Sequence, residues 1–80
     1  MNMQILSELV GKYVYVMAAS YAYAGKLVEF CEQGIKLEDP SIVYDTGPWD
    51  AADWADAQKL PTKWVFVGAA QIESAFAVER

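Results

Sequence analysis

The chain has 80 residues, carries 11 acidic against 6 basic side chains for a net charge of −5, and contains no histidine. This length predicts a single domain over residues 1–80, and the lack of histidine removes the commonest general base and the commonest metal ligand. The one cysteine, Cys31, has no second thiol to pair with and no obvious base nearby to activate it. Composition therefore argues against an enzyme and a zinc site, and we expect no metal and no cofactor.

The charge is unevenly distributed along the chain. Residues 29–57 hold eight acidic residues and one lysine, a balance of −7, whereas the rest of the chain carries +2. Proteins that bind nucleic acid neutralise phosphates with lysine and arginine, and no basic stripe of that kind is visible. Asp50, Asp53 and Asp56 lack the central glycine and closing glutamate of a calcium loop. We interpret the acids as a solvated face and predict no metal site there.

Apolar residues make up 55% of the chain, which includes three tryptophans, five tyrosines and three phenylalanines. This is more aromatic bulk than one small core needs, so part of it is expected to meet another subunit, with a well-filled monomer core as the alternative. The tryptophans are predicted to be packing or interface anchors (Trp49, Trp54 and Trp64). The longest apolar stretch, Tyr13 to Ala24, is too short to span a bilayer, and no signal-peptide pattern is visible. We therefore expect a soluble, cytoplasmic protein with no membrane association.

The first elements in chain order are a short helix and a strand. Met1 to Val10 spaces its apolar residues in two rows, as an amphipathic helix does, and Gly11 is suited to end it. Lys12 to Met17 is rich in β-branched and aromatic residues, which predicts a strand. Because both faces of that strand are apolar, we expect it to be covered on both sides.

Two further strands are predicted to form a hairpin. Gly25 lies inside the second strand, where it indicates a bend or a close approach of the backbone, and Leu27 to Phe30 continue that strand. Gln33-Gly34 is a plausible tight turn before a third strand that runs from Ile35 to Tyr44. Pro40 interrupts the third strand, which indicates a bulge or a sheet edge.

A longer excursion follows the third strand. Pro48 suits the first turn of a helix and Asp50 its positive end, so Trp49 to Lys59 is predicted to be a short helix, with a mobile acidic loop as the alternative. Lys63 to Val67 and Gln71 to Val78 are predicted to be the last two strands, joined by a tight turn.

Two motifs in this order resemble the halves of the Sm/Lsm signature. Gly25-x-Leu27-x-x-Phe30 precedes Ile35-x-Leu37-Glu38-Asp39, and Val65-Phe66-Val67-Gly68 precedes Ile72. The resemblance covers residues 3–78 and is greatest to Sm-like proteins of marine phage or environmental origin. It implies a mainly β fold with a short N-terminal helix and a five-stranded, strongly bent, SH3-like barrel. An acidic, tryptophan-containing helix or loop would lie between its third and fourth strands.

The resemblance also implies a mode of assembly. In the Sm-like family the fourth strand of one subunit pairs with the fifth strand of the next, and such a head-to-tail contact closes into a ring. We therefore expect a homo-oligomer of about five to seven subunits. The expected interface residues lie on the last two strands: Trp64, Val65, Phe66, Val67, Ile72, Ser74, Phe76 and Val78.

The positions at which the family binds uridine carry other residues here. The family has an aspartate after the phenylalanine, an asparagine before the next strand, and an arginine before the second glycine. This chain has Cys31, Gly34 and Val67 at or beside those positions, with Gln33 in the turn and Gly68 retained. Cys31 is interpreted as a small buried hydrophobe. The resemblance thus implies a degenerate pocket that binds U-rich RNA weakly or not at all, because no base-reading side chain remains.

Three functions remain open from the sequence. The first is a non-catalytic, ring-forming scaffold or adaptor whose ligand, if it has one, is another protein. The second is an RNA-binding Sm-like protein that uses an unconventional surface around four lysines: Lys12, Lys26, Lys59 and Lys63. The third is a peptide-binding module of the SH3-like type, with aromatic residues forming its groove.

Overall fold

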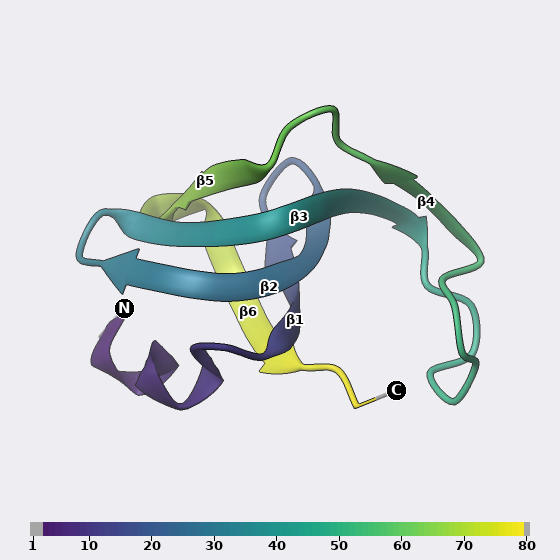
Figure 1. The fold of residues 1–80 in the computed structure, drawn as a ribbon, viewed down its shortest axis with the longest axis horizontal. Coiled ribbons are helices and arrows are strands. Elements are labelled where there is room, and N and C mark those ends of the chain that lie inside the picture. Colours follow the sequence, from purple (N-terminus) through teal and green to yellow (C-terminus); the bar gives the residue numbers. More distant parts are fainter. Residues whose placement is uncertain (1–2, 80) are drawn as a thin grey trace.

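A strongly bent antiparallel sheet of six strands forms most of the molecule in the computed structural model, which describes residues 3–79 (Figure 1). The elements in chain order are the 3-10 helix η1 (Met3–Leu9), β1 (Tyr13–Ala18), β2 (Ala22–Cys31), β3 (Gly34–Asp45), β4 (Asp56–Lys59), β5 (Trp64–Gly68), the 3-10 helix η2 (Ala69–Gln71) and β6 (Ile72–Ala77). The strands are ordered β4-β3-β2-β1-β6, and β5 also pairs with β3. The predicted mainly β fold with a short N-terminal helix is therefore confirmed.

The N-terminal helix buries one row of side chains. Met3 and Leu6 are buried and Leu9 is half-buried, a spacing of three that matches the repeat of a 3-10 helix. Ile5, from the second predicted row, is 71% exposed. Gly11 follows with φ 87°, a left-handed conformation that suits glycine. The helix prediction is thus confirmed over Met3–Leu9, and residues 1–2 lie outside the described part of the chain. The two predicted rows are not kept, because Leu9 packs with Met3 and Leu6 whereas Val10 is 44% exposed.

The predicted cover on both faces of β1 is present at the centre of the strand, which lies between two apolar layers. It pairs with β2 on one edge and β6 on the other. Val14 and Val16 point into the barrel, and Tyr15 is only 7% exposed on the opposite face. Tyr13 and Met17 remain largely exposed, so the cover over the outer face does not reach the two ends of the strand.

The bend in the sheet occurs where Gly25 of β2 meets Asp39 and Pro40 of β3. The register between these strands shifts between Ala24 and Lys26, and Asp39 adopts φ 50°. A Cβ atom on Gly25 would lie 3.0 Å from the Glu38 carbonyl oxygen, so the backbones approach closely here. Both predictions at this point, a close approach at Gly25 and a bulge at Pro40, are confirmed.

The predicted fourth strand, Lys63 to Val67, corresponds to β5, and the sixth strand is β4, which lies in the segment predicted as a helix or loop. Both β4 and β5 pair with the edge of β3 that β2 leaves free. Between them, the Leu60 amide donates to the Pro40 carbonyl at 2.9 Å, and the Asp39 amide donates to the Lys63 carbonyl at 2.8 Å. The interruption contains Pro61, which has no amide hydrogen to donate to a ladder.

The predicted helix from Trp49 to Lys59 is wrong. Residues 46–55 form a loop and Asp56–Lys59 form β4, so the loop alternative describes the first part of the excursion. The loop is closed by the Ala55 amide donating to the Thr46 carbonyl at 3.4 Å, and it contains Gly47 at φ 65°. Trp54 packs on the sheet instead of following a helical repeat, so tertiary packing overrides the helix propensity of the alanine-rich segment.

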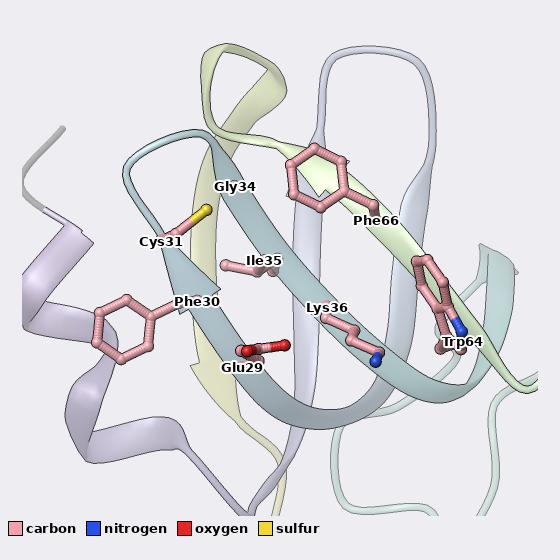
Figure 2. Close-up of a pocket in the computed structure, with 8 residues that line it drawn as sticks. All are labelled: Glu29, Phe30, Cys31, Gly34, Ile35, Lys36, Trp64 and Phe66. Carbon is pink, nitrogen blue, oxygen red and sulfur yellow. The ribbon is translucent and has the colours of Figure 1, made fainter.

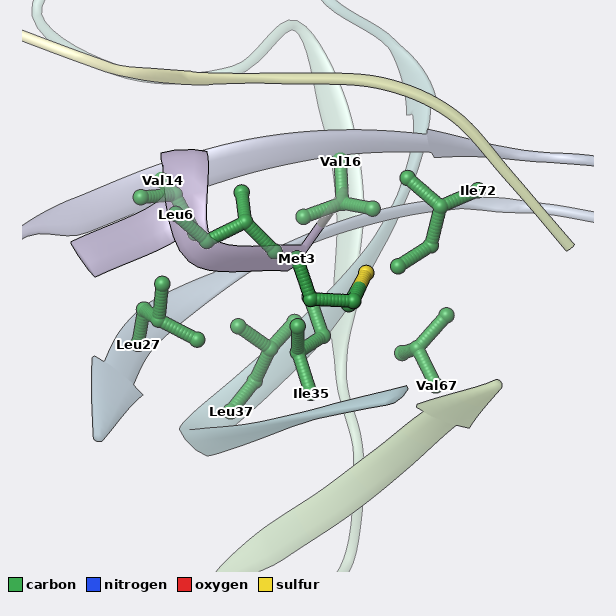
Figure 3. Packing of buried hydrophobic residues seen from close by; sticks show 9 residues of the cluster. All are labelled: Met3, Leu6, Val14, Val16, Leu27, Ile35, Leu37, Val67 and Ile72. Atoms are coloured by element: carbon green, nitrogen blue, oxygen red, sulfur yellow. The ribbon is translucent and has the colours of Figure 1, made fainter. Parts of the chain in front are cut away.

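The main core fills the inside of the bent sheet, and η1 contributes to it (Figure 3). The buried cluster consists of Met3, Leu6, Val14, Val16, Leu27, Ile35, Leu37, Val67 and Ile72. These side chains come from η1 and from β1, β2, β3, β5 and β6. One small cluster therefore joins the first helix to the last strand. Within residues 3–79, no helix has the length and apolar character needed to cross a membrane.

We predict opposite outcomes for two neighbouring aliphatic residues of η1. Leu6→Ala removes a side chain that is 4% exposed and should lower the free energy of unfolding by about 2–5 kcal/mol because it leaves a cavity. Ile5→Ala, at a position 71% exposed, should change it by less than about 0.5 kcal/mol. Urea denaturation of both variants at one protein concentration measures the difference, and equal losses would contradict the packing of η1.

Candidate functional site

The five positions of the predicted degenerate pocket come together at one end of the barrel. Cys31 and Gly34 face each other across the β2–β3 hairpin, and Gly34 is also paired with Gly68 of β5. The Gln33 carbonyl accepts a hydrogen bond of 2.7 Å from the amide of Ala69. Val67 precedes Gly68 and pairs with the residue after Gly34. The hairpin and the end of β5 therefore form one contiguous surface.

The side chains at these positions offer little polar chemistry. Cys31 is exposed, and its Sγ donates to Gln33 Oε1 at 3.2 Å, so its interpretation as a buried hydrophobe is wrong. Cys31 lies at the end of β2, beyond the core. The Val67 side chain points into the core, where it is 4% exposed (Figure 3). The polar side-chain atoms at the five positions thus belong to Cys31 and Gln33.

Gly34 occupies a position where a larger side chain does not fit. A Cβ atom built there would overlap the Val67 carbonyl oxygen and lie 2.6 Å from Phe66 Cζ. Phe66 has a side chain that can rotate away, but the carbonyl oxygen belongs to the paired strand and can move only if the ladder opens. The close pairing of Gly34 with Gly68 therefore depends on the absence of a side chain at position 34.

An open groove lies next to these positions on the outer face of the sheet (Figure 2). Its volume is about 320 Å³, and the residues that line it come from β2, β3 and β5: Glu29, Phe30, Cys31, Gly34, Ile35, Lys36, Trp64 and Phe66. The Lys36 Nζ lies 4.7 Å from the centroid of the Trp64 ring, a cation–π contact. Trp64 and Phe66 are 51% and 50% exposed.

Only part of this groove was predicted from the sequence. Trp64 and Phe66 were expected at a subunit interface, whereas Glu29 and Lys36 were not recognised as site residues. The sequence feature that could have identified the groove residues is the alternation of side chains along each strand. Glu29 and Cys31 share one face of β2, and Trp64 and Phe66 share one face of β5. The pairing of Lys36 with Phe66 across β3 and β5 then completes the groove.

A second group of aromatic residues, here called the aromatic cluster, covers the outer face of β1 and β6. Its members are Tyr15, Trp49, Trp54 and Phe76. The Tyr15 ring lies 5.4 Å from the rings of Trp54 and Phe76, and Trp49 lies 5.7 Å from Phe76. Trp54 Nε1 also donates to the Tyr13 hydroxyl at 3.0 Å. Trp54 is therefore a packing residue, while Trp49 remains 55% exposed.

Three strands have an edge without a partner strand within residues 3–79. β4 and β5 pair only with β3, and β6 pairs only with β1. Of the eight expected interface residues, Val67 and Ile72 are buried in the chain's own core, and the other six are exposed or half-buried. The backbone of all eight still lies on or beside the unpaired edges of β5 and β6.

The four lysines of the alternative RNA surface are interspersed with carboxylates. Lys26 stands directly opposite Glu38 in the β2–β3 register. Lys59 Nζ lies 4.0 Å from Asp39 Oδ1 in an exposed ion pair. In the part of the chain that the structure describes, no three acidic or cysteine side chains gather closely enough to hold a metal ion, so Asp50, Asp53 and Asp56 do not form such a group.

The sequence matches no protein-family model, and no curated protein is significantly similar to it. Among solved structures, the chain is similar to SmAP1 of P. aerophilum, an archaeal protein crystallised as a heptamer. The TM-score is 0.73 and the similarity covers 99% of this chain and 95% of SmAP1, with 18% sequence identity. The chain has an Sm-like fold. The strand order and the end-to-end coverage confirm the predicted architecture, and the resemblance to phage proteins stays a prediction.

We predict that position 34 of this Sm-like chain tolerates no side chain. Gly34→Ala should lower the free energy of unfolding by about 1–3 kcal/mol because the new Cβ overlaps the paired strand. Gly68→Ala is the matched control, since a Cβ there meets only the Gln33 carbonyl oxygen at 4.0 Å. Gly34→Asn should be no more stable than Gly34→Ala. Thermal unfolding by circular dichroism measures all three, and an unperturbed Gly34→Asn variant would contradict the steric argument.

Proposed function

We propose that this chain is a non-catalytic Sm-like protein that assembles into a homo-oligomeric ring and acts as a scaffold or binding module. One observation carries the proposal: the Sm-like sheet leaves the apolar strands β5 and β6 each with an unpaired edge. These two edges lie on different strands, so the contact they favour is head-to-tail. Such a contact must close into a ring or propagate as a filament.

The composition of the edge strands supports this assembly. β5 has the sequence Trp-Val-Phe-Val-Gly, with no charged residue and no proline to block pairing with another chain. Proteins that keep an edge strand free usually protect it with such residues, because exposed apolar edges aggregate. Pairing of β5 with β6 of the next subunit would satisfy both edges. SmAP1, which shares the fold, was crystallised as a heptamer, and we propose about five to seven subunits here.

We predict a ring mass in solution, and its loss when one edge carries a new charge. Light scattering at micromolar protein should give a single oligomeric mass for the wild type. Phe66→Lys places a charge on β5 at a residue that is 50% exposed, so it should dissociate the ring without unfolding the subunit. Phe76→Lys on β6 should have the same effect. Circular dichroism provides the folding control, and a monomeric wild type would refute the ring.

We further propose that the uridine site of the family is degenerate in this ring. Val67 points into the core, Gly34 has no side chain, and Cys31 is only a weak donor. Reading a base edge requires well-placed donors and acceptors. The segment 29–57 carries a balance of −7, and a ring repeats that charge around its circumference, which disfavours a polyanion within about 10 Å of the surface. The ligand of the ring would then be another protein in the cytoplasm.

We predict weak RNA binding without preference for uridine. Fluorescence anisotropy with U-rich, A-rich and mixed oligonucleotides at physiological salt should give similar, weak binding curves. Gln33→Ala should leave them unchanged, because no base is read at the turn. Tight, uridine-selective binding that Gln33→Ala removes would contradict the degenerate site. Tight binding that Gln33→Ala leaves intact but Lys12→Gln with Lys26→Gln weakens would favour the alternative RNA surface instead.

A further inference from the structure

We propose that the loop of residues 46–55 is an intersubunit element. In the ring, Trp49 and Phe76 of the aromatic cluster would pack against Trp64 and Phe66 of the partner subunit, at the mouth of the groove on its outer face. The inference rests on the proposed ring and adds to it a specific contact made by a segment outside the two edge strands.

The alternation of side chains in the sheet places the two aromatic surfaces on the same side. In β5, Val65 and Val67 pack against the core, so Trp64 and Phe66 face outward. In β6, Ala75 packs against the core, and Phe76 faces outward against Tyr15. When two strands pair, outward side chains of one lie beside outward side chains of the other. Pairing β5 with β6 of the next subunit therefore sets Phe76 beside Trp64 or Phe66.

The loop extends this contact beyond the strand. Trp49 lies 5.7 Å from Phe76 and 5.5 Å from Tyr15, so the loop carries it to the outer face of β6. The loop is held by the contact of Trp54 with Tyr15 and by its hydrogen bond to Tyr13. Trp49 is nevertheless 55% exposed, even though it is fixed in position. A large aromatic ring that is already ordered loses little entropy when a partner covers it.

Charge complementarity favours a second copy of this chain as the occupant. The loop carries Asp50 and Asp53 and no basic residue, and both carboxylates are exposed. The opposing surface carries Lys36 over the Trp64 ring, with Lys63 next to Trp64 in sequence, and Glu29 is the acidic residue that lines the groove. Head-to-tail pairing brings the acidic loop toward these lysines. The carboxylates of the loop would repel an RNA ligand. A neutral peptide would carry no charge to interact with either the loop carboxylates or the lysines.

The test is a double-mutant cycle on ring dissociation. In one chain the Trp49 ring contacts Tyr15, Trp54 and Phe76, whereas the Trp64 ring contacts Lys36, so residues 3–79 show no ring contact between them. Trp49→Ala and Trp64→Ala should each raise the protein concentration at which the ring half-dissociates by about tenfold. If the two rings meet across the interface, the double variant should raise this concentration by clearly less than the product of the two single-variant factors. Sedimentation across a dilution series measures the three values.

A matched control and a second pair of substitutions keep the outcome clear. Ile5→Ala removes an apolar side chain that is 71% exposed on η1, outside both edge strands and the loop, and should leave dissociation unchanged. Asp50→Asn with Asp53→Asn changes only exposed side chains, so folding should be preserved. This pair should weaken the ring at low salt and reduce the effect of added salt on dissociation.

The possible failures are distinguishable. A monomeric wild type refutes the ring itself. If neither Trp49→Ala nor the aspartate pair changes the dissociation of the wild-type ring, the intersubunit loop is overturned and the ring remains. The same conclusion follows if the effects of Trp49→Ala and Trp64→Ala on dissociation simply multiply in the double variant. A decaproline peptide should not bind the assembled ring. Binding of that peptide, if lost in Trp49→Ala, would instead assign the aromatic cluster to peptide recognition.

Discussion

The close backbone contact between Gly25 and β3 is the constraint on which the rest of the structure depends. Each strand of the β2–β3 pair is long, and a flat pair would leave its apolar face without a core to cover. The contact of Gly25 with Glu38 and Pro40 lets the pair bend at its middle, so that one half of β3 receives β5 and the other half receives β4. Without the bend, the side chains that form the core would not converge.

The same bend determines which strands keep an unpaired edge. Because β3 is already paired on both edges, the unpaired edges fall to the short, exposed strand β4 and to β5 and β6. The apolar surface outside the core is distributed in the same way, with Trp64 and Phe66 on β5 and with Phe76 and Trp49 around β6. The excess of aromatic residues noted in the sequence therefore collects beside the two edges that another subunit would cover.

The parts of the fold that could be predicted are those in which local pattern and tertiary structure agree. The β-branched and aromatic residues of Lys12 to Met17 predicted β1, the Gln33-Gly34 turn predicted the hairpin, and Pro40 and Gly25 marked the bulge. The segment from Trp49 to Lys59 was predicted wrongly because its alanines and its Pro48 start favour a helix, whereas the contacts of Trp54 with Tyr13 and Tyr15 decide its shape. Those contacts join residues about forty positions apart, and no local pattern records them.

The candidate site was harder to predict than the fold. Motif position identified the hairpin and the end of β5, but exposure could not be read from it, so Cys31 was expected in the core and lies on the surface. Glu29 and Lys36 became recognisable only when the register between β2, β3 and β5 was known. A groove formed by alternate residues of three strands has no contiguous sequence signature.

The interruption at Pro61 has a consequence for the dynamics of the chain. β4 has four residues, all exposed, and it pairs with a single neighbour, so little holds it in place beyond its own ladder. Since Pro61 separates it from β5, β4 can detach from β3 without disturbing the strand that contacts the core. Amide hydrogens of β4 should then exchange through local opening, and those of β1 only when the whole domain unfolds. Each such opening would loosen only the end of the loop next to β4, because the contacts of Trp54 with Tyr13 and Tyr15 hold the loop against β1 independently of β4.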